Sequence, residues 1–236
     1  MNFLFHGEVI DYIYINSQST KTIVFLHGWG GDKFSFASTI NLFKKEFNIL
    51  TLTMPTTKDC VSFWTMFDYS NLVENLLAVH NISKPIIICH SFGFRVATVL
   101  NQKLKFSKIV VTAGAGAKKN NILYKIDKNN SVILLKNSKF EKFFENFASK
   151  DYKCLSKINK QTFKNVVNFN TLNMLKFNMP ILLFWGKKDK DTKIWIAKKI
   201  KKQNKSCELL LTNGDHFTYL EKNSLFNYKI KEFLND

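Results

Sequence analysis

The sequence predicts one α/β domain: a mostly parallel β-sheet with helices on both faces and a helical cap inserted late in the chain. Three observations support this fold class. Short apolar runs rich in β-branched residues alternate with longer segments of helical periodicity. Most of these runs are almost continuously apolar, as in strands buried on both faces. The chain has 236 residues, 45% of them hydrophobic, which suits one domain with a large core spanning 1–236.

The expected strands and helices follow in order along the chain. The strands are Val9–Ile15, Thr22–Leu26, Ile49–Thr53, Pro85–Cys89, Lys108–Thr112, Ile181–Trp185 and Glu208–Leu211, with Asn2–Phe5 as a possible antiparallel edge. The expected helices are Phe34–Lys45, Phe67–Val79, Phe94–Lys103, Lys193–Lys202 and Ser224–Leu234.

One long segment interrupts this alternation. More than sixty residues separate the strand ending near Thr112 from the one starting near Ile181, which is too long for a plain connection. We expect a cap or lid at about 113–176. Within it, Phe140, Phe143, Phe144 and Phe147 have helical spacing and predict a helix with one phenylalanine face. That face could pack on the main domain, cover a pocket, or do both.

The strongest local motif is Ile87-Ile88-Cys89-His90-Ser91-Phe92-Gly93. An apolar strand runs into Ser91, and a helix follows at once. A serine on such a sharp turn holds its hydroxyl above the sheet, as the G-x-S-x-G turn does for a nucleophile. A Ser-x-Gly turn can also be purely structural, so further residues must decide between the two interpretations.

A second motif, Phe25-Leu26-His27-Gly28-Trp29-Gly30-Gly31, follows an early strand. Acyl transfer creates an oxyanion that needs preorganised N–H donors. The backbone N–H groups of Trp29 and Phe92 are the candidates, because glycines let the first loop approach closely. The same segment could be a plain glycine-rich turn. A phosphate-binding loop is disfavoured, because no G-x-G-x-x-G or Gly-Lys-Ser/Thr sequence occurs.

An acid and a base follow two later strands. Asp189 comes three residues after Gly186, with Asp191 as its rival, and His216 follows the last strand. The order Ser91, Asp189, His216 is the triad order of one large class of α/β enzymes. Each residue lies just past the carboxyl end of a strand, where open α/β sheets place their sites. We assign no catalytic role to His6, His80 or His90, and we expect His90 to point away from the site.

The motifs around Trp29, Ser91, Asp189 and His216 resemble those of small α/β hydrolases, including carboxylesterases, thioesterases and the biotin-pathway pimeloyl-carrier-protein methyl esterases. Further similar segments are Trp64-Thr65 with Asp68-Tyr69, Ser149–Tyr152, Thr162-Phe163 and Val166–Asn168. The resemblance covers nearly the whole chain and implies the α/β-hydrolase fold. The chain departs from the pattern where Cys89 replaces a glycine, where Phe94 replaces a small residue, and where Thr53–Thr57 replaces the usual Asp-x-Pro-Gly-x-Gly loop.

These features predict a serine hydrolase that cleaves a small-molecule ester or thioester through an acyl-enzyme, without a metal or organic cofactor. Two alternatives stay open. One is a catalytically idle binding protein on the same scaffold, since Cys89 and Phe94 could distort the turn. The other is a carbon–carbon bond hydrolase or lyase that uses the same triad.

The charge is strongly positive, at +17, and unevenly distributed. Residues 118–164 contribute +8 (12 Lys, 4 acids) and residues 187–205 contribute +7 (9 Lys, 2 acids). Such patches attract anionic partners, for example an acidic acyl carrier. Coding bias is the competing explanation: of 35 basic residues, Arg95 alone is an arginine. We expect no nucleic-acid partner.

The remaining composition predicts a cytoplasmic protein. No signal peptide is evident at the first residues, and no apolar stretch approaches the length of a membrane-spanning helix. The four cysteines, Cys60, Cys89, Cys154 and Cys207, lack the spacing of a metal site or a disulfide framework.

Overall fold

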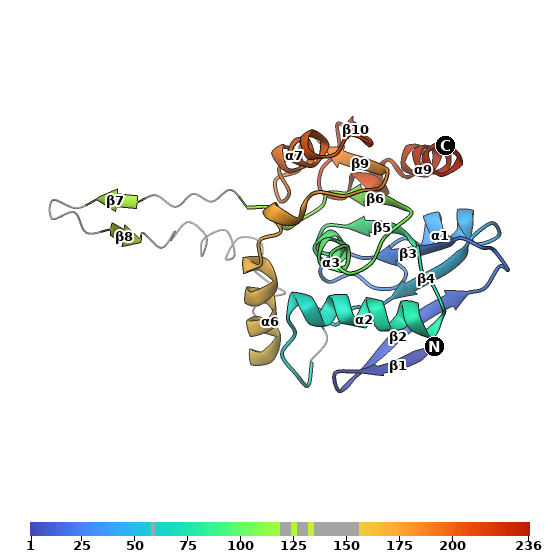
Figure 1. Ribbon diagram of the computed structural model, residues 1–236, viewed down its shortest axis with the longest axis horizontal. Coiled ribbons are helices and arrows are strands. Elements are labelled where there is room, and N and C mark those ends of the chain that lie inside the picture. Colours follow the sequence, from blue (N-terminus) through green and yellow to red (C-terminus); the bar gives the residue numbers. More distant parts are fainter. Residues whose placement is uncertain (58–59, 119–123, 127–131, 135–155) are drawn as a thin grey trace.

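A computed structural model describes residues 1–57, 60–118, 124–126, 132–134 and 156–236 (Figure 1). Its centre is an eight-stranded sheet with the order β1-β2-β4-β3-β5-β6-β9-β10. β2 pairs antiparallel with β1 and β4, and all other neighbours are parallel. The strands are β1 (Asn2–Phe5), β2 (Glu8–Ile15), β3 (Thr22–Leu26), β4 (Asn48–Leu52), β5 (Ile86–His90), β6 (Lys108–Thr112), β9 (Ile181–Gly186) and β10 (Cys207–Thr212). The predicted parallel sheet with its antiparallel edge is confirmed.

Each face of the sheet carries its own apolar core. Alternate residues of β3 point to opposite faces, so that Val24 and Leu26 belong to one core while Ile23 and Phe25 belong to the other. The first core includes residues of α2 (Met66–Val79), α3 (Phe92–Leu100) and α7 (Trp195–Gln203). The second includes residues of α1 (Ala37–Phe43), α8 (Thr218–Glu221) and α9 (Asn223–Asn235). β3, β4, β5 and β9 are therefore buried on both faces, whereas the edge strand β10 is partly exposed.

The segment between β6 and β9 contains most of the elements that the sequence pattern did not reveal. These are the antiparallel pair β7 (Tyr124–Ile126) and β8 (Val132–Leu134), the helix α6 (Lys157–Asn168) and a 3₁₀ turn at Leu172–Met174. The helix expected around Phe140–Phe147 lies outside the described residues. α6 lies at the α2 side of the sheet, and the β7–β8 pair extends from the body of the molecule (Figure 1).

Two boundaries differ from expectation. The helix predicted from Phe34 is shorter, because residues 33–36 form turns before α1 begins at Ala37. α8, which follows His216 directly, was not predicted as a separate helix. Among the described residues, no helix is long and apolar enough to cross a membrane.

Candidate active site

Ser91 occupies the turn between β5 and α3 in a strained conformation. Its φ of 48° and ψ of −108° lie in a region that a serine adopts only when its surroundings impose it. Three backbone hydrogen bonds impose it here. The Ser91 N–H donates to the Thr112 carbonyl (3.1 Å), and the Ser91 carbonyl accepts from the N–H groups of Phe94 (3.1 Å) and Ala115 (3.0 Å). The turn is thus held from both the strand and the helix side.

The two small positions of this turn are not equivalent. A Cβ on Gly93 would lie 2.1 Å from the Leu26 carbonyl oxygen, so only glycine lets α3 pass the end of β3. Cys89, in contrast, is fully buried in the core, and its Sγ contacts the Val110 carbonyl oxygen at 3.5 Å. The cysteine therefore fits without crowding the serine.

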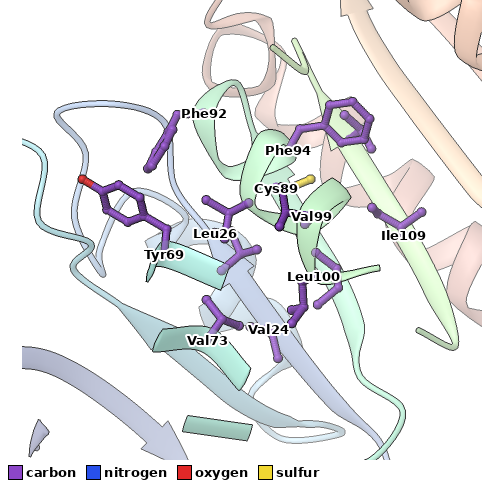
Figure 2. Packing of buried hydrophobic residues seen from close by; sticks show 14 of the residues in the cluster. Val24, Leu26, Tyr69, Val73, Cys89, Phe92, Phe94, Val99, Leu100 and Ile109 are labelled. Atoms are coloured by element: carbon purple, nitrogen blue, oxygen red, sulfur yellow. The ribbon is translucent and has the colours of Figure 1, made fainter. Parts of the chain in front are cut away.

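Phe94 also leaves the serine side of the turn open. Figure 2 shows Phe92 near Tyr69 and Phe94 on the opposite side of Cys89, toward Ile109. Phe94 is fully buried, with its ring centroid 6.0 Å from that of Phe177. Both departures from the usual pattern are thus accommodated in the core.

The loops after β9 and β10 bring the acid and the base together. His216 Nδ1 lies 3.0 Å from Asp189 Oδ2, and both residues are buried. A Cβ on Gly186 would lie 2.2 Å from the Asp215 carbonyl oxygen, so a glycine at the end of β9 allows the two loops to touch. The Lys188 N–H then donates to the Gly214 carbonyl (3.0 Å) and joins them.

Asp189 is held as an ionised hydrogen-bond acceptor. The Thr192 N–H (2.8 Å) and the Asp191 N–H (2.8 Å) donate to Oδ1, and the Thr192 hydroxyl (2.6 Å) donates to Oδ2. Burial opposes ionisation, but the hydrogen bonds from His216 and Thr192 outweigh it and lower the pKa of the Asp189 carboxyl. An ionised acceptor at Nδ1 keeps the proton on that nitrogen and leaves Nε2 free to act as a base.

Asp191, the rival acid, lies close by but contacts Asp189 through its backbone. Burial is the main cause that raises the pKa of its side chain, and the neighbouring carboxylates of Asp189 and Asp215 add to it. One ligand atom each from Asp189, Asp191 and His216 falls within 4.8 Å, close enough in principle for a metal ion. The hydrogen bonds of Asp189 already use both of its oxygens, so a role as hydrogen-bond acceptor to His216 explains the contacts better than a metal site does.

Within the described residues, no hydrogen bond joins the Ser91 hydroxyl to the His216 ring. The ring of His90, next to Ser91 in the chain, lies 4.8 Å from the His216 ring, centroid to centroid. In active sites generally, the contact between a serine and its base is often long before substrate binds. The structure thus places Asp189 against His216, and places His90, the residue before Ser91, against the same histidine.

His90 does not point away from the site, and our expectation for it was wrong. Its Nε2 lies 3.1 Å from the His216 carbonyl oxygen, so this nitrogen carries the proton and donates. A Cβ on Gly28 would lie 2.6 Å from His90 Nδ1, so the glycine-rich loop closes directly over the ring. Burial, with the nearby His216 adding to it, lowers the pKa of His90 to about 3. The neutral ring therefore joins the segments of Ser91 and His216 and the loop of Trp29.

The candidate oxyanion residues also meet. The ring centroids of Trp29 and Phe92 are 5.4 Å apart in an edge-to-face arrangement. The loop of Trp29 is fixed by His27, whose Nε2 accepts from the Met54 N–H (2.8 Å) and whose Nδ1 contacts the Gly28 carbonyl (2.7 Å). Burial lowers the pKa of His27 to about 4, so this ring stays neutral as well.

The sequence analysis missed three residues that shape the site: His27, His90 and Thr192. Thr192 had a readable signal, because a hydroxyl three residues after an aspartate commonly bonds back to it. The two histidines had none, since their partners lie on loops distant in the chain.

Comparison with known proteins supports the same fold. No protein-family model matches the chain. An uncharacterized hydrolase of Bacillus subtilis, YugF, is 24% identical over 120 residues, which are 48% of this chain and 44% of that relative. The match thus spans less than half of the relative's length.

Solved structures match over nearly the whole chain, at low identity. A hydrolase from Pseudomonas aeruginosa has a TM-score of 0.78 at 12% identity, covering 100% of this chain and 98% of its own. An esterase from Exiguobacterium antarcticum has a TM-score of 0.72 at 12% identity, with 97% and 96% covered. A meta-cleavage product hydrolase from Pseudomonas fluorescens has a TM-score of 0.73 at 14% identity, with 100% and 97% covered. The protein has the α/β-hydrolase fold.

Proposed function

We propose that the protein is a serine hydrolase that cleaves a carboxylic ester or thioester. The observation that carries the proposal is the buried hydrogen bond between Asp189 and His216. The ring of His90 contacts His216, and Ser91, in a strained turn, is the next residue in the chain. A surface aspartate and histidine need no burial and no such partner. The fold of known esterases and hydrolases agrees with this chemistry.

The proposed reaction has two acyl transfers. His216 Nε2 accepts the Ser91 hydroxyl proton as Oγ attacks the carbonyl carbon. The developing oxyanion is bound by the N–H groups of Trp29 and Phe92, and Asp189 stabilises the imidazolium. The imidazolium protonates the leaving alcohol or thiol, and water, deprotonated by the same histidine, then releases the acid. No step needs a metal or an organic cofactor.

A fluorophosphonate probe tests the nucleophile without knowledge of the substrate. We expect the wild-type protein to be labelled and Ser91→Ala and His216→Ala to lose labelling by several orders of magnitude. An exposed serine variant, Ser224→Ala, is the control. Wild-type protein that resists the probe would favour the idle binding protein instead.

The choice between the two acids can be tested in the same assay. Asp189→Asn should slow labelling strongly, because an amide at this position no longer fixes the histidine tautomer. Asp191→Asn should have a small effect, since its backbone N–H still donates to residue 189. If Asp191→Asn proves the more damaging change, the acid assignment is wrong.

A panel of p-nitrophenyl esters and acyl thioesters of graded length then defines the acyl group. Carbon–carbon bond cleavage is the second candidate, because a meta-cleavage product hydrolase shares the fold. Activity on carbon–carbon substrates with none on the esters would favour it.

A further inference from the structure

Arg95 stands out in a chain that otherwise uses lysine. It is the one arginine among 35 basic residues, and it lies on α3 four residues after Ser91. Its side chain is buried, with 8% exposed. Its Nη1 donates to the carbonyls of Val166 (2.9 Å) and Val167 (3.4 Å), and also to that of Phe169. All three carbonyls belong to the C-terminal end of α6.

These contacts explain why an arginine is present. The last carbonyls of a helix lack partners within it and carry partial negative charge, so a cation there is favourable. Burial lowers the pKa of Arg95 only to about 10, so the guanidinium stays charged at neutral pH. A lysine buried in the same place would lose its charge far more readily. Arg95 therefore links the C-terminal end of α6 to α3, the helix that follows Ser91.

α6 in turn contacts the loop that holds Trp29. The Phe163 ring, from the middle of α6, packs edge-to-face on the Trp29 indole with centroids 5.0 Å apart. The Thr162 hydroxyl oxygen accepts from the Trp64 N–H (3.0 Å) and fixes the same turn of α6 to the body. A shift of α6 would therefore move the aromatic support of Trp29.

We propose that Arg95 is a positioning residue that acts through α6: it fixes Phe163 against Trp29 and so holds the oxyanion loop in place. The contacts of Arg95 with α6, and of Phe163 with Trp29, support the docking of α6 and of the Trp29 loop. The catalytic consequence rests on the proposed function.

Hydrogen exchange measures the docking without any activity. In Arg95→Met we expect amide exchange to rise about tenfold or more both in α6 and in the Trp29 loop, and to stay unchanged in α9, which packs in the other core. In Arg95→Lys, the exchange rates of α6 and the Trp29 loop should lie between those of the wild-type protein and those of Arg95→Met. The matched control is Lys103→Met, which removes an exposed cation just after α3 that contacts Asn71 and Glu74 of α2. Unchanged exchange in α6, or a rise confined to α6, overturns the proposal.

Fluorophosphonate labelling measures the consequence. We expect Arg95→Met and Phe163→Ala each to slow Ser91 labelling about tenfold, and the double variant to be little slower than either, because both act through one contact. Additive losses overturn the proposal, as does faster exchange with an unchanged labelling rate. If wild-type protein is not labelled at all, the proposed function fails, and the exchange in the Trp29 loop still decides whether Arg95 positions it.

Discussion

At the scale of single residues, His90 supports the candidate site although it takes no step in the proposed reaction. His90 is buried and neutral, and its Nε2–H donates to the His216 carbonyl while Gly28 closes over the ring. The base of the proposed reaction is thus held at two points: Asp189 fixes its ring and His90 fixes its backbone. A shift of His216 by an ångström is enough to lower the rate of acylation strongly.

We predict that His90→Phe lowers kcat by roughly 10- to 100-fold with little change in KM, because it keeps the ring but loses the donor. His90→Gln, whose amide nitrogen can reach about the Nε2 position, should recover much of kcat. Steady-state kinetics of the wild-type protein, His90→Phe and His90→Gln on one ester test this role of the His90 N–H. A phenylalanine variant with wild-type kcat would show that the bond to His216 is dispensable.

At the scale of elements, α6 shows why a real helix escaped the sequence pattern. Its buried residues are Asn159, Thr162, Phe163 and Val166, which have the spacing i, i+3, i+4, i+7 of one helical face. Two of the four are polar, because they accept from the N–H groups of Cys60 and Trp64 in a loop 98 or more residues away. A search for apolar residues at helical spacing misses such a helix, because half of its buried face is polar and hydrogen-bonded.

The central strands are the opposite case. β3, β5 and β9 are buried along their whole length, so their apolar runs predicted them within a residue or two. The candidates Ser91 and Asp189 followed from β5 and β9, and His216 from the partly buried β10, since each comes just after a carboxyl end. The contacts of His27, His90 and Arg95 could not be predicted in the same way. They join loops or helices that are distant in the chain and come together only in the folded protein.

The docking of α6 gives a test at this scale. Thr162→Val should destabilise the protein by about 1–3 kcal/mol, because it leaves the buried Trp64 N–H without an acceptor. Thr171→Val is the matched control. Its hydroxyl is buried without a hydrogen-bond partner among the described residues, so its loss should be neutral or stabilising. Urea denaturation measures both, and equal losses would contradict the role given to Thr162.

At the scale of the whole molecule, the buried neutral histidines predict a sensitivity to mild acid. Burial lowers the pKa of His27 to about 4 and that of His90 to about 3, whereas both rings titrate near pH 6.5 in the unfolded chain. Between the folded and the unfolded pKa values, the unfolded chain binds protons on His27 and His90 that the folded chain does not bind. The stabilisation is present above pH 6.5 and is lost as the pH falls toward the folded pKa values.

We predict that the free energy of unfolding falls from pH 6 to pH 5 with a slope of up to about 2.7 kcal/mol per pH unit, about 1.4 for each histidine. Urea denaturation at pH 7, 6 and 5 measures the slope, in a range above that of ordinary carboxylates. His27→Gln should halve the slope, whereas His6→Asn, at an exposed position, serves as the control. A flat profile in the wild-type protein would contradict the burial of the two rings.

The charge of the molecule gives the last prediction. Lys187, Lys188, Lys190 and Lys193 are exposed on the loop that carries buried Asp189, so part of the +7 of residues 187–205 flanks the proposed site. Much of the other basic segment, 118–164, lies outside the described residues. Charge around a site raises the association rate of an anionic substrate, and salt weakens this effect, with a Debye length of about 8 Å near physiological ionic strength. An acyl group on an acidic carrier or an anionic thiol would be drawn in this way.

We therefore expect kcat/KM to fall steeply with salt for an anionic thioester and only slightly for a neutral ester of the same acyl chain. Replacing Lys187, Lys188, Lys190 and Lys193 with glutamine should flatten the salt dependence of the anionic substrate and leave the neutral one unchanged. Four glutamines at Lys229, Lys231, Lys44 and Lys45, which lie on or beside α9 and α1, provide the control for net charge alone. If the lysines reflect coding bias alone, kcat/KM should depend on salt equally and weakly for both substrates. The two four-glutamine variants should then behave alike. That outcome would remove the acidic partner while leaving the serine chemistry intact.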